Sequence, residues 1–313
     1  MTATASKPSH YLGLGLGLCA VSTASILIRY AQAGGAPSLV IAAWRLTFAG
    51  LILLPVVLWR YRAEVRALTP RAWALALASG LFLGVHFATW ISSLAYTTVA
   101  SSTVLVSSAP LFVALISAAA LREWPARSVV LGLSVALAGI VAIGAADLCQ
   151  PHGCPALTDL WQGRAFVGNM LALAGAVALA GYYTLGRALR LGQPGRAPLS
   201  LITYIFITYG TACLALMATV LALRVPVTGY GPPVWLWLAL LAIVPQLVGH
   251  SSFNWALKFL PATYVSVAAL GEPIGSTVLA VFLLGEMPSA LKIAGGVLIL
   301  AGIAVASRGP AAA

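Results

Sequence analysis

The stretch from Leu94 to Ile140 occurs twice in this chain, and its last part reads LREWPARSVVLGLSVALAGI at residues 121–140. A shift of 163 residues places it on Leu257 to Ile303 without a gap, where the corresponding part reads LGEMPSALKIAGGVLILAGI at residues 284–303. The matched positions include Pro110 with Pro273, Glu123 with Glu286, Pro125 with Pro288, Gly132 with Gly295 and Gly139 with Gly302. Matching leucines mean little in so apolar a sequence, but matching glutamates, prolines and glycines indicate an internal duplication.

The composition excludes a water-soluble domain. Only 7% of the 313 residues are charged and 61% are hydrophobic, whereas soluble domains carry about 25% charged residues. Apolar runs recur along almost the whole chain, and a helix that spans a membrane needs roughly 20 such residues. The net charge of +11 would suggest nucleic acid in a soluble protein. Here the basic residues occupy short loops, so we expect a lipid bilayer and no nucleic acid as partner.

The hydrophobic runs predict an all-α membrane protein with ten transmembrane helices. The expected spans are 11–31, 37–59, 72–95, 99–121, 128–146, 166–187, 199–223, 233–257, 262–284 and 288–307. With the amino terminus inside, twelve basic residues fall on the inner side: Lys7, Arg60, Arg62, Arg66, Arg71, Arg122, Arg127, Arg187, Arg190, Arg196, Lys258 and Arg308. Four fall on the outer side: Arg29, Arg164, Arg224 and Lys292. This asymmetry predicts a cell inner membrane protein with both termini in the cytoplasm.

The duplication has a topological consequence. Five spans per half is an odd number, so the second half enters the membrane from the opposite side to the first. We therefore expect two inverted five-helix repeats, at residues 1–150 and 166–313, joined by an outer loop at 151–165. Inverted repeats are typical of secondary transporters, which bind their substrate near the membrane midplane between the two halves.

Over nearly its whole length, the chain resembles the EamA-type permeases of the drug/metabolite transporter (DMT) superfamily. The resemblance is carried by Ala43-Trp44-Arg45, by the segment from Pro110 to Glu123 with the glycines after it, and by Glu272-Pro273 and Gly285-Glu286. One departure is Arg122, which stands where the family usually has a glycine before the first-half glutamate. The resemblance implies ten helices in two inverted repeats and the export or exchange of small metabolites, often amino acids.

Two prolines are the first candidates for function. Pro110 and Pro273 lie near the middle of the fourth and ninth expected spans, at matching places in the two halves. A proline inside a helix removes a backbone hydrogen bond and bends the helix. In a membrane the freed carbonyl must face protein or a water-filled cavity. We therefore expect hinge or cavity-lining positions, and packing kinks without a ligand are the alternative.

Polar residues at helical spacing are the candidates for substrate binding. Gln246, His250 and Asn254 recur every four residues and so share one face of the eighth span. His86 and Trp90 form a comparable stripe in the third span. Such side chains indicate that the two helices line a polar path through the membrane. The alternative is that they are packing residues whose hydrogen bonds are satisfied within the protein. The full set of cavity candidates is His86, Trp90, Ser107, Tyr182, Gln246, His250 and Asn254.

Arg45 and Glu272 are the opposite charges expected within the membrane core. At about 1.5 Å per residue, Arg45 lies roughly 12 Å and Glu272 roughly 18 Å below the outer ends of their spans. A direct or water-bridged ion pair is therefore within reach if the two spans are neighbours. In one alternative, Arg45 extends towards the outer surface while Glu272 caps the half-helix that starts at Pro273. In the other, Glu272 binds the proton that couples transport.

The sequence lacks the motifs that several other functions need. It has no Walker-type phosphate loop, so the chain does not itself hydrolyse ATP, and no H-E-x-x-H or G-x-S-x-G motif. Cys149 and Cys154, in the loop between the halves, form a local disulfide or remain free thiols, and a metal site there is disfavoured. We expect neither a cofactor nor a bound metal.

Together these features predict a permease that moves small metabolites, amino acids or related compounds first, across the cytoplasmic membrane by alternating access. A carrier of drugs, nucleotide-like or lipid-linked compounds is the alternative within transport. The rival from another class is an intramembrane enzyme that uses His86 or His250, and the missing acid and nucleophile partners disfavour it. The expected partners are a small-molecule substrate and the lipid bilayer, and a homodimer is left open.

Overall fold

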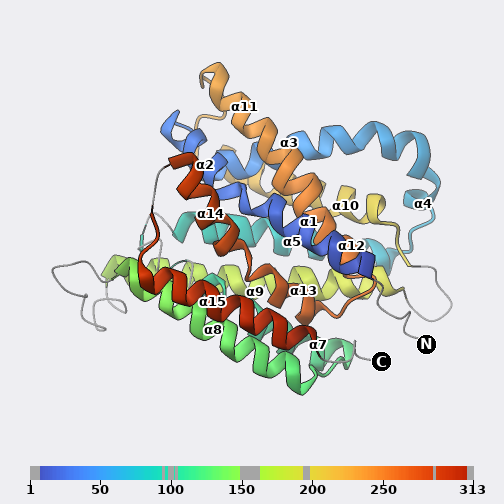
Figure 1. Ribbon diagram of the computed structural model, residues 1–313. Coiled ribbons are helices and arrows are strands. Elements are labelled where there is room, and N and C mark those ends of the chain that lie inside the picture. The colour runs from blue at the N-terminus through green and yellow to red at the C-terminus, as the bar shows by residue number, and fades with distance from the viewer. Residues whose placement is uncertain are drawn as a thin grey trace.

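All regular elements in the described residues are helices. The computed structural model describes residues 8–93, 96–97, 102, 105–148, 163–192, 198–284 and 287–308. The first half contains α1 (Pro8–Ser22), α2 (Ala24–Ala33), α3 (Ser38–Val56), the π-helix η1 (Val57–Tyr61), α4 (Arg62–Arg66), α5 (Pro70–Ser93), α7 (Ala109–Leu121) and α8 (Arg127–Leu148). The second half contains α9 (Gly163–Leu191), α10 (Leu201–Ala222), α11 (Pro232–Leu241), the π-helix η3 (Ala242–His250), α12 (Ser251–Ala256), α13 (Ala262–Ala269), α14 (Glu272–Leu284) and α15 (Ala290–Ser307) (Figure 1).

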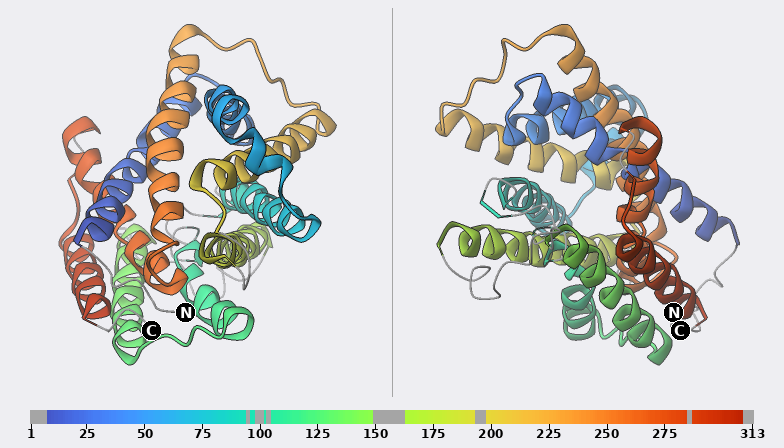
Figure 2. Two further views of the ribbon diagram at one scale, coloured as in Figure 1. Left: turned by 90° about the vertical axis from the view of Figure 1, so that its right-hand side faces the viewer. Right: turned by 60° about the vertical axis from the view of Figure 1, so that its left-hand side comes forward.

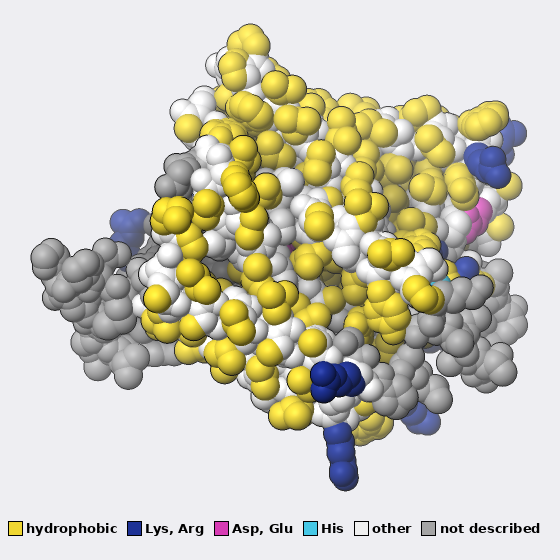
Figure 3. Space-filling model, viewed as in Figure 1, with side chains coloured by type: hydrophobic (Ala, Val, Ile, Leu, Met, Phe, Trp, Pro, Cys, Tyr) yellow, Lys and Arg dark blue, Asp and Glu magenta, His cyan; other side chains and the backbone are white. Residues whose placement is uncertain are grey.

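Many of these helices are suited to a bilayer. Among the described residues, seven stretches are long and apolar enough to cross a membrane: Pro8–Ala33, Ser38–Arg66, Pro70–Ser93, Gly163–Leu191, Leu201–Ala222, Pro232–Ala256 and Ala262–Leu283. Three shorter apolar helices, Ala109–Leu121, Arg127–Ile143 and Ala290–Ala306, lie where the fourth, fifth and tenth spans were predicted. Hydrophobic side chains cover much of the face seen in Figure 3, and its Lys and Arg side chains lie towards the edges. The predicted all-α membrane protein is confirmed.

The helices of the two halves pack against each other in a matched way. α3 packs along α10, which is its counterpart under the 163-residue shift. α5 packs along α9, and α1 packs against η3 and α12. The 163-residue shift carries α1 onto α9, and it carries α5 onto the helix from α11 to α12. The contact of α1 with η3 and α12 is therefore the counterpart of the contact of α9 with α5. Figure 2 shows α5 beside α9 and α8 beside α15.

Glycines bring α8 and α15 into backbone contact. A Cβ atom added at Gly132 would lie 2.4 Å from the carbonyl oxygen of Gly302, and one added at Gly139 would lie 2.5 Å from that of Gly295. Such distances exclude any side chain, so these positions need glycine for the helices to approach this closely. The helices run antiparallel at this contact. Gly132 faces Gly302, which is the counterpart of Gly139, and Gly139 faces Gly295, which is the counterpart of Gly132.

Three of the spans are interrupted. α1 is followed after Thr23 by α2, α13 is separated from α14 by Leu270 and Gly271, and α7 begins after a turn at Ser107 and Ser108. Pro110 and Pro273 therefore stand in the first turn of α7 and α14, where a missing N–H group costs no hydrogen bond. The expected bend is therefore a break: a new helix begins one residue before each proline, at Ala109 and Glu272, close to the half-helix start that one alternative placed at Pro273.

Two of these interruptions lie beside each other. The Ser276 hydroxyl donates to the backbone carbonyl oxygen of Ser22 at 3.0 Å. The Ser22 hydroxyl lies 3.4 Å from the backbone carbonyl oxygen of Glu272. Gly275 permits the approach, because a Cβ atom there would overlap the Ser22 hydroxyl. Serine side chains thus satisfy carbonyl groups that the helix breaks release.

Candidate functional site

We define the central cluster as six buried or half-buried polar and aromatic side chains that come from four elements of the two halves. Its members are Arg45 from α3, His86 and Trp90 from α5, Gln246 and His250 from η3, and Asn254 from α12.

Phe87 connects the two sides of the central cluster. The Arg45 guanidinium lies 4.6 Å from the centre of the Phe87 ring, and the His250 ring lies 5.7 Å from it. The His86 and Trp90 rings stack with their centres 5.8 Å apart. The two stripes expected from the sequence therefore come together, and Phe87, which sequence reasoning missed, lies between them.

The central cluster contains most of the unpaired buried polar atoms of the described residues. Seven side-chain atoms in it have no hydrogen-bond partner: Nε and Nη2 of Arg45, Nε1 of Trp90, Nε2 and Oε1 of Gln246, Nδ1 of His250 and Oδ1 of Asn254. Outside it, the described residues contain only Glu123 Oε2 and Ser128 Oγ in this condition. Buried polar groups are nearly always hydrogen-bonded in proteins, because leaving one unpaired is costly. A concentration of unpaired donors and acceptors indicates a site that water or a ligand fills.

Other atoms of the same residues are held firmly. His86 Nδ1 lies 3.0 Å from the Gly175 carbonyl oxygen, which can only accept, so Nδ1 carries the proton and Nε2 of the neutral ring is left as an acceptor. The Asn254 amide donates to the hydroxyl of Tyr182 at 2.5 Å and to that of Tyr209 at 3.3 Å. These bonds fix the orientation of His86 and Asn254 and leave their other polar atoms for a ligand.

The local structure of η3 explains how Gln246 and His250 are presented. Pro245 lies inside this element and has no N–H group to donate to the preceding turn. The backbone forms a π-helix, a conformation often found at functional sites. The expected single α-helical face through Gln246, His250 and Asn254 is therefore replaced by a wider turn. Tyr209, which the sequence reasoning did not select, holds this turn from α10 through contacts with Ser251 and the Gln246 carbonyl.

The expected direct ion pair between Arg45 and Glu272 is not formed. Arg45 is only 1% exposed, and Glu272 is half-buried in the first turn of α14. The two charges are close enough to act on each other electrostatically, but no ion pair joins these two described residues. The water-bridged form stays a prediction. Ser107 lies half-buried in the turn before α7, and its place in the substrate site stays a prediction.

A second polar group lies at the end of α9, where Arg187 and Arg190 are both buried. Arg187 donates to Glu123 through Nε at 3.0 Å and to the Leu257 carbonyl through Nη1 at 2.7 Å. Arg190 donates to the carbonyl groups of Asn254 and Leu199. We call Glu123, Arg187 and Arg190 the arginine lock, because their bonds join the ends of α7, α9 and α12.

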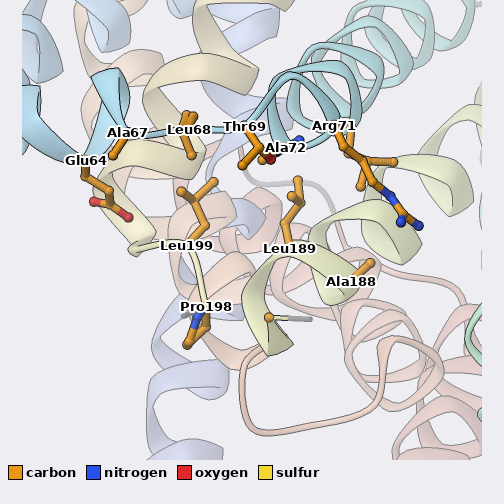
Figure 4. A pocket seen from close by; sticks show the side chains of 12 residues that line it. Glu64, Ala67, Leu68, Thr69, Arg71, Ala72, Ala188, Leu189, Pro198 and Leu199 are labelled. Carbon is orange, nitrogen blue, oxygen red and sulfur yellow. Dashed lines mark hydrogen bonds between the residues drawn. The ribbon is translucent and has the colours of Figure 1, made fainter. Parts of the chain in front are cut away.

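A surface pocket of about 290 Å³ lies near the arginine lock, but none of the predicted site residues lines it. In Figure 4, Glu64 and Arg71 stand on opposite sides of the pocket, with leucine side chains between them. The Glu64 carboxylate is already occupied, because it accepts hydrogen bonds from Ser200 and Thr203 at the start of α10. The pocket is thus mainly apolar and separate from the central cluster. The predicted Cys149 and Cys154 site and Glu286 lie outside the described residues.

Comparisons with known proteins give a family, two transporters of similar sequence and a solved structure of similar fold. The profile of the EamA-like transporter family matches the chain twice, at residues 9–145 and 166–308. The uncharacterized transporter YwfM of Bacillus subtilis is 24% identical over 278 residues, which cover 88% of this chain and 86% of that protein. An uncharacterized transporter of Archaeoglobus fulgidus is 32% identical over 74 residues, 24% of this chain and 27% of that protein. One crystal structure has the same fold, with a TM-score of 0.76, 23% sequence identity, and coverage of 96% of this chain and 97% of its own.

Proposed function

The chain belongs to the EamA-like transporter family, and from this premise we propose that it is a secondary transporter of small metabolites in the cytoplasmic membrane. Amino acids and related compounds are the substrates we propose first. The observation that carries the proposal is the central cluster, where seven buried polar atoms lack a hydrogen-bond partner and where Arg45 and His250 pack against the Phe87 ring. Unpaired donors and acceptors next to aromatic surface suit a small solute that has both polar and apolar parts.

We propose further that the chain has ten spans in two inverted repeats, residues 1–150 and 166–313. The double family match supports the two copies. The contact between α8 and α15 supports their inversion, because these counterpart helices are antiparallel and Gly132 and Gly139 each face the counterpart of the other. A two-fold axis in the membrane plane would produce this pairing of glycines with each other's counterparts. The same axis would place the central cluster between the repeats.

Alternating access would then open one end of this site at a time. The bonds of the arginine lock hold the ends of α7, α9 and α12 together, so release of substrate on that side requires the contact between Arg187 and Glu123 to break. Pro110 and Pro273 start helices after an interruption and are suited to act as hinges for such a movement. α8 and α15, joined through their glycines, would remain the fixed scaffold.

The orientation follows from the distribution of basic residues and can be tested by thiol labelling. We expect both termini in the cytoplasm, so the arginine lock faces inward. In intact cells, a membrane-impermeant maleimide should label Cys149 or Cys154 after mild reduction and should not label a cysteine introduced at Ala67. Labelling at position 67 alone would contradict this orientation and indicate the opposite one.

The transport proposal is tested by comparing cells with and without the protein. We expect at least one small metabolite to accumulate in the medium only when the protein is present, and purified protein in liposomes to move it without chemical change. His86→Ala and Trp90→Ala should reduce this movement while membrane insertion stays normal. His10→Ala, at the start of α1, serves as the control. A chemically altered product would instead favour an intramembrane enzyme, and normal transport by both variants would remove His86 and Trp90 from the site.

A further inference from the structure

Arg45 is a buried cation whose hydrogen-bond donors are not used. Its side chain is 1% exposed, and its guanidinium lies 4.6 Å from the centre of the Phe87 ring. Nε and Nη2 have no hydrogen-bond partner, and no ion pair joins Arg45 to an acidic side chain in the described part of the chain. A guanidinium group does not lose its proton in proteins, so the positive charge persists. Charged side chains inside a membrane span are costly and mark substrate or ion pathways.

The two unpaired nitrogens of Arg45 stand on the same edge of its planar guanidinium group. On this edge the N–H bonds of Nε and Nη2 are parallel, and a carboxylate can accept both hydrogen bonds at once through its two oxygens. The contact with Phe87 offsets only part of the cost of removing the charge from water, and it leaves both donors unpaired. The free edge of Arg45 therefore fits a carboxylate.

The protein does not place a carboxylate of its own against this edge. α3, which carries Arg45, packs mainly against α2, α5, η1, α10, α11 and η3. Neither α3 nor any of these elements contains an Asp or Glu residue. Glu272 acts on Arg45 only at a distance, because no ion pair joins them and α14 packs against α1 and α2. A ligand is thus left to supply the carboxylate.

We propose that the central cluster binds monocarboxylic acids and holds their carboxylate on the free edge of Arg45. This proposal rests on the proposed transport function and deepens it. Among amino acids and related compounds, it selects the related acids that lack an ammonium group. The rings of Phe87 and His250, whose centres lie 5.7 Å apart, provide apolar surface for the rest of the substrate.

The charge of the site favours a monocarboxylate over an amino acid or an amine. The central cluster has no acidic member, so an ammonium group on the substrate would gain no ion pair from it. A monocarboxylate neutralises the charge of Arg45, whereas a zwitterion or a neutral solute leaves a positive charge in the membrane core, and an amine adds a second one. Because Arg45 is buried, the acid reaches it only when one end of the site opens, as alternating access requires.

The first test compares ligands that share one carbon skeleton, on the purified full-length protein at neutral pH. Thermal unfolding is measured with a panel of aliphatic, aromatic, 2-hydroxy and 2-oxo monocarboxylates. The strongest stabiliser is then compared with its amide, its amine and its amino acid. For 4-methylpentanoate these are 4-methylpentanamide, isopentylamine and leucine.

We expect the acid to bind at least about tenfold more tightly than the amide and the amine, because only the acid pairs with the charge of Arg45. It should bind no more weakly than the amino acid. Equal binding by the amide or the amine, tighter binding by the amino acid, or stabilisation by no acid of the panel overturns the proposal.

Variants assign the preference to Arg45. In Arg45→Gln the acid should bind no better than its amide. Arg45→Lys keeps the charge but loses the planar pair of donors, so it should bind the acid about tenfold more weakly than the wild type. It carries the test if Arg45→Gln does not fold. Glu272→Gln and Arg224→Gln, the latter at an exposed position, should keep the wild-type preference. A preference that survives in Arg45→Gln, or that is lost in Glu272→Gln, contradicts the assignment to Arg45.

The design separates this proposal from the transport function. Transport of an uncharged metabolite, with no binding of monocarboxylates, would refute the carboxylate site and leave the transporter intact. Binding of a monocarboxylate with the expected preference but no movement of it or of any other solute across liposomes would do the opposite.

Discussion

Arg45 in the central cluster and Arg187 and Arg190 in the arginine lock are all buried, with exposed fractions of 1%, 7% and 3%, yet their surroundings differ in kind. Arg187 and Arg190 donate to a carboxylate and to three carbonyl groups, whereas two nitrogens of Arg45 have no partner. Charge-assisted hydrogen bonds hold helix ends together. A buried charge without such bonds destabilises the folded protein unless a ligand or water supplies them. The bonds of the arginine lock are therefore suited to stabilise the fold, and the unpaired atoms of the central cluster fit the binding role that we propose for it.

The largest effect is expected from breaking the arginine lock. Arg187→Gln leaves Glu123 without its ion-pair partner and removes the donor to Leu257. Loss of one member of a buried pair costs about 3–5 kcal/mol, and we expect the lower end, about 3 kcal/mol, because the Glu123 side chain is 21% exposed. The thermal unfolding midpoint of the purified protein measures this loss.

A double variant distinguishes the ion pair from general damage. Glu123→Gln combined with Arg187→Gln should recover much of the stability lost in either single variant, because no charge is left without a partner. Arg71→Gln, an exposed arginine, should have little effect. Losses that simply add in the double variant would contradict the ion pair as the cause.

Arg45→Gln should behave in the opposite way. It removes a charge that has no partner in the protein, so the unfolding midpoint should stay the same or rise. Transport should fall about tenfold or more, since one good interaction with a substrate charge is worth at least about 1.4 kcal/mol. This differs from the result expected for a structural pair with Glu272, in which Arg45→Gln would lower the yield of folded protein. A fall in stability equal to that of Arg187→Gln would remove the distinction between the two regions.

The smallest effects come from a matched pair of tryptophans. Trp44 donates to the Val227 carbonyl at 2.8 Å, whereas Trp90 Nε1 has no partner. Trp44→Phe should therefore cost about 1 kcal/mol of stability and leave transport normal, while Trp90→Phe should leave stability normal and reduce transport about fivefold. Unfolding and transport are measured on the same preparations. Similar profiles for the two variants would show that an unpaired donor does not mark the site.

Much of the fold could be predicted from the sequence, and the failures have physical reasons. Matched glycines and prolines predicted the duplication, because glycine permits a close backbone contact and proline is well suited to the first turn of a helix. The interruptions before Pro110 and Pro273 were placed at the right positions but with the wrong geometry. A proline predicts that a backbone hydrogen bond of the helix is lost. Neighbouring side chains decide whether the helix bends or ends there. The contacts of Ser22 with Ser276 and Glu272 are an example.

The residues of the candidate site were proposed from the sequence and their role stays a prediction, but their arrangement could not be predicted. Sequence spacing placed Gln246, His250 and Asn254 on one α-helical face, but Pro245 and the bonds from Tyr209 produce a π-helix there. Arg187 and Arg190 were counted as basic residues of the inner side. Nothing in their sequence positions indicated that carbonyl groups from α12 and the α9–α10 connection would surround them.

By itself the sequence determined that this chain is helical, lies in a membrane, contains two copies of one unit and belongs among the EamA-like transporters. These properties depend on hydrophobicity, on the repeat spacing of 163 residues and on scarce residues at matched positions, all of which can be recognised along the chain without the fold. Only the tertiary structure decided which buried charges have partners, since a hydrogen bond between α9 and α7 or α12 depends on groups far apart in the chain. For that reason the sequence could place Arg45 inside a span and Arg187 and Arg190 near its inner end, but only the folded protein shows that two nitrogens of Arg45 are left without a partner.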